Sequence, residues 1–288
     1  MYKLENAIRR WTLLRIFAYV IGIMAPVVLF EWGTHFAVPD EPSPYHAPIR
    51  AALNFAGPLL MLFNYRFLVR RFEDRAAKEI GFQPISLVLG LLVGFAAIGV
   101  SYAALWGLGV AHFEPGRFGA EYAPAFIFYV CIGIMEELLC RVVVFRLVEE
   151  AGGTMVAIVI SGLLFGFAHA ANDGATFASC LCIALEAGVL FALAYALTRN
   201  LWLCAGIHLG WNFAEGEIFG GAVSGVEAKR AMIKSTLAGP DYLTGGVFGL
   251  EASAVTVVVC GVICLALWRL VMLRGNWREL TRFRFSLA

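Results

Sequence analysis

The sequence contains few charged residues. Asp, Glu, Lys and Arg make up 15% of its 288 residues, whereas hydrophobic residues make up 60%. Soluble domains are about 25% charged and about 45–50% apolar, so this composition excludes a soluble globular protein and a disordered chain. The formal net charge of +1 gives no argument for binding nucleic acid, and we expect no such partner. The composition predicts a protein that crosses the lipid bilayer several times.

Cysteine is missing from the polar segments, although the chain has seven cysteines. Each of them lies inside an apolar run, where an oxidising compartment would not place a disulfide. We interpret them as small buried hydrophobic residues. Cys204 and His208 are four residues apart and could share a metal ion, but a structural zinc site usually takes four such ligands. The cysteines therefore predict no disulfide framework.

Apolar runs of about 20 residues, long enough to cross a bilayer, occur repeatedly along the chain. They predict an all-α polytopic membrane protein, a bundle of about eight transmembrane helices that forms a single domain over residues 1–288. The predicted spans are residues 12–31, 49–69, 85–110, 122–147, 154–171, 177–198, 200–219 and 247–271.

The basic residues are divided unequally between the two sides of such a bundle. If both termini are cytoplasmic, seventeen of the 22 Lys and Arg residues face the cytoplasm. The positive-inside rule therefore predicts cytoplasmic termini in the plasma (inner) membrane. A cleaved signal peptide over residues 1–38 is the alternative for the first span, but no A-x-A site follows its long apolar run. The outward residues are Arg50, Arg117, Lys229, Arg230 and Lys234.

The outward segment 220–246 is rich in glycine and carries charges of both signs. It is the only predicted loop long enough to act as a lid over a site in the bundle.

Ionisable side chains in hydrocarbon are costly, so each one needs a reason. The fourth span contains Glu136, Glu137 and Arg141. Glu137 and Arg141 are four residues apart and can pair on one helix face, whereas Glu136 is rotated from Glu137 by about 100°. The arginine would neutralise one carboxylate and leave the other to act as a general base on water. Taken alone, the pattern also fits a buried ion pair that only fixes helix packing.

The fifth and seventh spans each contain a histidine. Phe165 and His169 are four residues apart, as are His208 and Asn212, so each pair shares a helix face. With a rise of about 1.5 Å per residue, both histidines, Asn212 and Glu136 fall in one layer of the bilayer. Three helices are thus predicted to contribute to one polar cluster.

Glycines spaced by four residues occur on both histidine-bearing spans, as Gly162 and Gly166 and as Gly206 and Gly210. Such glycines let two helix backbones approach closely, which favours a tightly packed cluster.

Taken in order, these patterns resemble the three motifs of the CPBP family, the CAAX-protease and bacteriocin-processing intramembrane endopeptidases of the Rce1-like or Abi group. The resemblance covers about residues 122–219, the predicted catalytic core helices. It implies an eight-helix bundle around a conical, water-filled polar cavity, and a glutamate-dependent peptidase. The matching residues are Glu136-Glu137-x-x-x-Arg141, Phe165-x-x-x-His169 and His208-x-x-x-Asn212.

The resemblance also implies a role for each motif residue. Glu136 would activate the attacking water with help from His169, and His208 and Asn212 would stabilise the tetrahedral oxyanion. The implied substrate is a membrane-associated protein or peptide, which in the best-known members is a prenylated CAAX protein. The supporting residues would be Glu137 and Arg141 behind the site and Phe165 in its wall.

A zinc-dependent peptidase is one alternative, because two histidines and a glutamate form the ligand set of some zinc enzymes. Its ligands would be Glu136, His169 and His208. The His-Glu-x-x-His pattern is absent, however, and the ligands would come from three helices, so we expect no cofactor.

Two alternatives are not enzymes of this kind. A non-catalytic membrane scaffold or immunity protein could use the same helices to bind a partner, because a fold can outlive its chemistry. A transporter could use Glu136, His169, His208 and Glu186 of the sixth span as an ion path, but the related halves typical of transporters are not seen. The sequence leaves the role of Glu186 open between function and packing.

Overall fold

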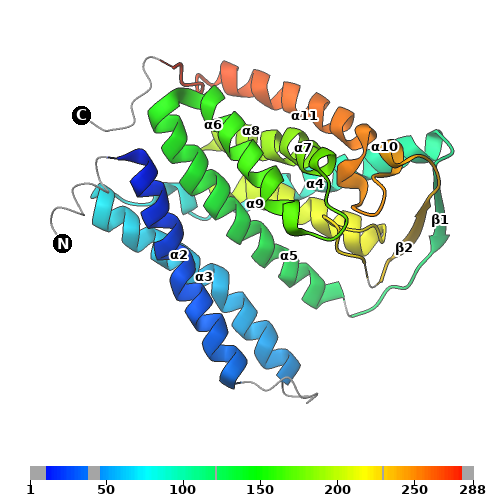
Figure 1. The fold of residues 1–288 in the computed structure, drawn as a ribbon, viewed down its shortest axis with the longest axis horizontal. Helices are drawn as coiled ribbons and strands as arrows, with labels where there is room; N and C mark the ends of the chain where they lie inside the picture. Colours follow the sequence, from blue (N-terminus) through cyan, green and yellow to red (C-terminus); the bar gives the residue numbers. More distant parts are fainter. Residues whose placement is uncertain (1–10, 38–45, 121, 229, 281–288) are drawn as a thin grey trace.

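The computed structural model describes residues 11–37, 46–120, 122–228 and 230–280, which form a helical bundle with a two-stranded ribbon at one end (Figure 1). Three π-helical segments, η2 (Leu138–Phe145), η4 (Ala184–Gly188) and η5 (Ala214–Ile218), extend α5, α7 and α9. The helices are α2 (Thr12–Ala37), α3 (His46–Glu73), α4 (Pro84–Gly107), α5 (Tyr122–Glu137), α6 (Arg146–Ala168), α7 (Phe177–Ile183), α8 (Val189–Thr198), α9 (Leu201–Phe213), α10 (Asp241–Thr244) and α11 (Ala254–Leu273).

All eight predicted spans are helical, and the all-α polytopic membrane fold is confirmed. Within the described residues, five helical stretches are long and apolar enough to cross a membrane. The last predicted span begins too early: α11 starts at Ala254, and η6 (Leu250–Ala252) precedes it. The reason is Gly249, whose φ of 112° is incompatible with a helix. The single-domain boundaries stay a prediction.

The predicted lid segment, residues 220–246, contains a β-strand. Its β2 (Ile233–Leu237) pairs antiparallel with β1 (Ala111–Pro115), which follows α4. This pairing joins the middle of the segment to β1, beyond the end of α4, at one end of the molecule (Figure 1).

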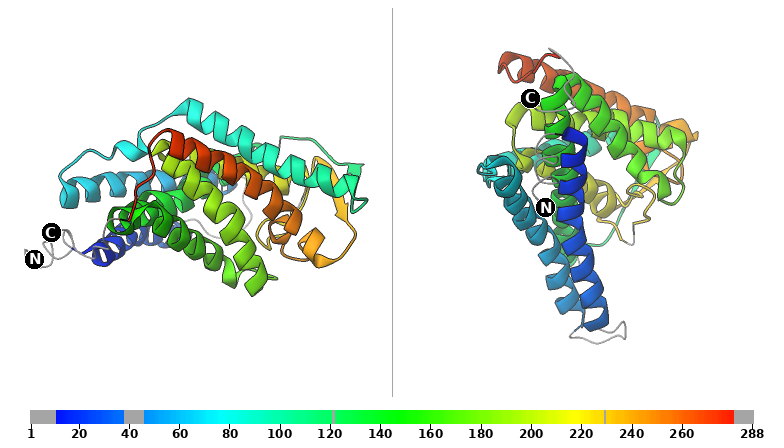
Figure 2. Two further views of the ribbon diagram at one scale, coloured as in Figure 1. Left: turned by 90° about the horizontal axis from the view of Figure 1, so that it is seen from above. Right: turned by 60° about the vertical axis from the view of Figure 1, so that its left-hand side comes forward.

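Helix α9 lies at the centre of the bundle, where it packs against α4, α5 and α8 (Figures 1 and 2). Every one of its residues is buried, as expected for a helix that is apolar on all sides. Gly206 and Gly210 meet a second glycine pair, Gly90 and Gly94 of α4. A Cβ on Gly94 would lie 2.6 Å from the backbone nitrogen of Trp211. The close approach predicted for this glycine pair is confirmed, and its partner is α4.

Replacing Gly94 with alanine is expected to lower the free energy of unfolding by about 1–3 kcal/mol, because the added methyl overlaps the α9 backbone. Gly99 is the matched control: it lies on the same helix, and a Cβ there meets nothing within 4 Å. Gly99→Ala is expected to be neutral or slightly stabilising. Thermal unfolding of the two purified variants in detergent measures the difference, and equal midpoints would contradict the packing described.

Helices α2 and α3 lie side by side and extend beyond the other helices (Figures 1 and 2). An ion-pair network fastens their other end to the bundle. Arg146 of α6 donates to Glu73 of α3 at 2.8 and 3.0 Å and to Glu150 at 2.9 Å. Arg15 of α2 also pairs with Glu150. The charges are compensated within the network, which makes their burial tolerable.

The chain turns sharply at Gly153, whose φ is 80°, and the C-terminal segment fits against this turn. The backbone of Arg278 exchanges hydrogen bonds with Thr154 at 2.8 and 3.0 Å. Glu149 pairs with Arg199 beside it. Ion pairs at this end of the bundle involve five arginines that were predicted to face the cytoplasm: Arg15, Arg75, Arg146, Arg199 and Arg278. Six of the other basic residues lie outside the described residues: Lys3, Arg9, Arg10, Lys229, Arg282 and Arg284.

A change of pH should affect the contact at Glu79, just after α3. Burial acts to raise the pKa of this carboxyl, but hydrogen bonds from Arg75 and Tyr65 outweigh it and hold the pKa below its ordinary value. A lowered native pKa stabilises the fold above the unfolded pKa of about 4.3, and this stabilisation is lost as the pH falls below it.

We therefore expect Glu79→Gln to lower the thermal unfolding midpoint at pH 7. The difference in midpoint between variant and wild type should narrow as the pH is lowered below about 4. A gap that stays constant or widens would contradict the assignment.

Candidate active site

A cavity of 440 Å³ lies between α5, α6, α9, η6 and the segment that follows η5. Its walls are mostly apolar, with Phe128, Ile132 and Phe191 among them. Five of the seven predicted site residues line it. These are Glu136, Phe165, His169, His208 and Asn212.

The two remaining predicted residues, Glu137 and Arg141, are fully buried beside the cavity. Arg141 Nη1 donates to Glu137 Oε1 at 3.2 Å, so the predicted i, i+4 pair is confirmed. Arg141 Nη2 donates to the carbonyl oxygens of Ala187 and Gly188 at 3.3 and 3.2 Å. Those carbonyls lie at the end of the π-helical segment η4, where the ordinary helix ladder is interrupted and carbonyls can accept from a side chain. The π-helical segment thus helps to hold the guanidinium.

His208 is oriented by the same buried carboxylate. Its Nδ1 lies 3.0 Å from Glu137 Oε1, so Nδ1 carries a proton and donates it to the carboxylate. Its Nε2 lies 4.0 Å from Glu136 Oε2, too far for a hydrogen bond but close enough for one water to contact both atoms. Glu137 therefore aims the second ring nitrogen of His208 at Glu136.

His169 begins η3 (His169–Ala171), where α6 ends. Its Nδ1 lies 2.8 Å from the carbonyl oxygen of Phe165. A carbonyl oxygen can only accept, so Nδ1 carries the proton and the neutral ring has its lone pair on Nε2. His169 therefore offers the cavity a proton acceptor.

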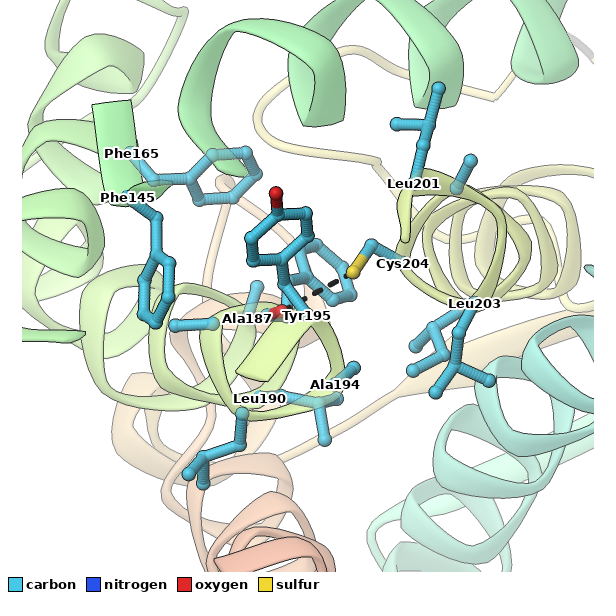
Figure 3. Packing of buried hydrophobic residues seen from close by; sticks show 14 of the residues in the cluster. Phe145, Phe165, Ala187, Leu190, Ala194, Tyr195, Leu201, Leu203 and Cys204 are labelled. Atoms are coloured by element: carbon cyan, nitrogen blue, oxygen red, sulfur yellow. Dashed lines mark hydrogen bonds between the residues drawn. The ribbon is translucent and has the colours of Figure 1, made fainter. Parts of the chain in front are cut away.

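Phe165 connects the parts of the site. Its ring lies under the Arg141 guanidinium, 4.3 Å from ring centroid to Cζ, and 5.9 Å from the His208 ring. Figure 3 shows the same ring on the side of a buried cluster with Phe145 and Tyr195. The cation–π contact with this packed ring helps to hold the Arg141 guanidinium in place.

Glu136 and Asn212 keep their polar atoms available. The Glu136 side chain is 36% exposed, and it makes no hydrogen bond within the described residues. The Asn212 amide, one turn beyond His208 on α9, likewise makes none within the part of the chain that the structure describes. A carboxylate, an imidazole lone pair, a second imidazole and an amide thus face one space.

Glu186 lies on η4 and is fully buried, but it does not line the cavity. Neither of its carboxylate oxygens has a hydrogen-bond partner among the described residues. It therefore lies outside the group of side chains that a ligand in the cavity would touch.

Sequence reasoning missed Glu251, Trp211 and Ser224, which also line the cavity. Glu251 was inside a predicted span, and a carboxylate in an apolar run was the signal that could have singled it out. Trp211 adjoins Asn212 on the same helix, but an aromatic residue in a membrane span carries no signal of its own. Ser224 comes from the predicted lid segment, which supports a contact between that segment and the cavity.

The predicted zinc ligands do not form a metal-binding group. Nowhere in the described ranges are three or more His, Cys, Asp or Glu residues placed so that they could hold a metal ion. Cys204 is also directed elsewhere: its sulfur donates to the carbonyl oxygen of Phe191 on α8 at 3.4 Å, as the dashed line in Figure 3 shows.

Residues 119–214 match the family model described as type II CAAX prenyl endopeptidase Rce1-like. This stretch is about a third of the chain, and it includes all seven predicted site residues. Comparisons with curated proteins and with solved structures gave no match.

Proposed function

We propose that the protein is an intramembrane endopeptidase, on the premise that its residues 119–214 match the Rce1-like family model. It hydrolyses a peptide bond of a membrane-associated protein or peptide. The observation that carries the proposal is the convergence of Glu136, His169, His208 and Asn212 on one cavity inside a bundle of membrane-spanning helices.

Glu136 is the general base in this proposal. Its exposed carboxylate takes a proton from water while the water oxygen attacks the substrate carbonyl carbon. His169 assists, because its Nε2 lone pair can accept a hydrogen bond from the same water or hold the proton during transfer. The proton then passes to the leaving amine as the peptide C–N bond breaks.

His208 and Asn212 stabilise the negative charge that develops on the carbonyl oxygen. The Asn212 amide donates without titrating. His208 donates from Nε2 when its ring is protonated, and the Glu137 carboxylate on Nδ1 stabilises that cation. The surrounding apolar wall strengthens both interactions, since charges attract more strongly where water is excluded.

Arg141 and Phe165 support this arrangement without touching the substrate carbonyl. Arg141 pairs with Glu137 and holds it in place, and Phe165 packs between Arg141 and His208. Their contribution is to hold the reacting groups in one geometry.

The substrate class follows from the surroundings of the site. Only a chain that is itself membrane-associated, by prenylation as in CAAX proteins or by an apolar segment, would reach a cavity inside the bundle. We also propose that the protein lies in the plasma (inner) membrane and that the end with the ion-pair network faces the cytoplasm. Five arginines gather there, which agrees with the positive-inside rule.

Mass spectrometry of peptide termini tests the proposal. Membranes and medium from cells that express the wild type are compared with those from cells that express Glu136→Gln at the same level. We expect new termini in the wild type that are missing from the variant. Identical sets of termini would contradict the peptidase and favour a scaffold.

We propose that the reaction uses protein side chains and no metal ion, because Glu136, His169 and His208 are not placed, among the described residues, so that they could share one ion. Incubation of the purified protein with 1,10-phenanthroline should leave the cleavage rate within about twofold. A loss of activity that added zinc restores would contradict this and support Glu136, His169 and His208 as ligands.

A further inference from the structure

A second carboxylate lines the same cavity. Glu251 belongs to η6 and lies outside the stretch that matches the family model. Its side chain is almost fully buried, with the residue 4% exposed. A buried carboxylate at the wall of a cavity is costly unless other groups compensate it.

The protein compensates the Glu251 carboxylate only with neutral donors. Trp211 Nε1 donates to Oε1 at 3.2 Å, and Ser224 Oγ donates to Oε2 at 2.6 Å. Both oxygens therefore act as acceptors in these contacts. Each oxygen has capacity for a further donor.

No basic side chain among the described residues forms an ion pair with Glu251, and neither lysine nor arginine lines the cavity. The cavity carries two carboxylates, Glu136 and Glu251, among mostly apolar walls. Apart from the site histidines His169 and His208, a positive charge that pairs with Glu251 would therefore come from the molecule that enters the cavity.

The position of Glu251 is fixed by its neighbours. Glu215 of η5 accepts a hydrogen bond from the backbone nitrogen of Leu250 at 2.9 Å, which holds η6 against the end of α9. Glu215 is itself fully buried. These contacts hold the Glu251 carboxylate in the cavity wall.

We propose that Glu251 binds a lysine or arginine side chain of the peptide substrate and gives the cavity a preference for a basic residue. This rests on the proposed peptidase function. Glu251 bonds to Trp211, which adjoins Asn212 of the proposed oxyanion site. Glu251 and Asn212 line the same cavity, so the basic residue lies near the scissile bond.

Peptide binding, measured without cleavage, tests the proposal. The Glu136→Gln protein in detergent is titrated into fluorescein-labelled leucine–alanine peptides, and binding is followed by anisotropy. In each peptide one position carries either lysine or its neutral analogue norleucine. We expect one position at which lysine binds at least about tenfold more tightly, the gain of one charge-assisted hydrogen bond.

Adding Glu251→Gln should bring this lysine-to-norleucine ratio to about one. Glu227→Gln is the matched control, because it removes an exposed negative charge from the same connecting segment, and it should keep the ratio. Glu251→Asp keeps the charge on a shorter side chain and decides the question if the glutamine variant does not fold. For Glu251→Asp, a lowered lysine-to-norleucine ratio or a different preferred position for lysine supports the proposal. An unchanged ratio overturns it.

The proposal is also overturned if lysine is preferred at no position, or if the preference survives Glu251→Gln. If the peptides bind equally and the wild type cleaves them, the peptidase stands and only the role of Glu251 fails. If no peptide binds, both proposals fail.

Discussion

Replacing Glu136 with glutamine is expected to lower the rate constant for peptide hydrolysis by about a thousandfold or more. Glutamine keeps the size of the side chain but cannot take a proton from water, and general-base catalysis contributes about 10²–10⁴-fold. The carboxylate is exposed to the cavity and makes no hydrogen bond within the described residues, so its loss should not disturb packing. Cleavage of a membrane peptide by the purified protein in liposomes measures the effect.

Two variants make this result interpretable. Glu227→Gln removes an exposed charge that does not line the cavity and should change the rate by less than about twofold. Glu136→Asp keeps the base but shortens it and should retain partial activity. A Glu136→Gln protein that cleaves at the wild-type rate would exclude this residue as the base.

Replacing Arg141 with methionine is expected to lower the free energy of unfolding by about 3–5 kcal/mol. The change leaves the Glu137 carboxylate buried without its cation, which is the costly way to break a buried ion pair. It also removes the donor to the η4 carbonyls and the cation over Phe165. The thermal unfolding midpoint of the detergent-solubilised protein measures the loss.

The exposed Arg274 provides the matched control, and Arg274→Met should change stability by less than about 0.5 kcal/mol. The double variant Glu137→Gln/Arg141→Met should recover part of the lost stability, because no unpaired charge remains. It should stay inactive, since His208 then loses the carboxylate that orients it. If the single variant Arg141→Met is as stable as the wild type, the pair is not the internal support described.

The sequence by itself determined the spans and the local pairs. Hydrocarbon offers no water to backbone groups, so a long apolar run must be helical, and the eight predicted runs are helical. The period of the helix likewise places Arg141 one turn from Glu137 and exposes Glu136 on another side. These features depend only on neighbours in the chain.

Only the tertiary structure decided which side chains meet across helices. Glu137 and His208 are 71 residues apart, and their contact depends on how α5 and α9 are rotated against each other. That rotation is set by packing, including the approach of Gly94 to the α9 backbone. Hydropathy predicts that the last helix begins at residue 247, but the positive φ of Gly249 delays its start. Glu251 therefore lies before the helix, where it reaches the cavity. Helix period fixes a side chain's direction on its own axis, but packing of whole helices fixes what it faces.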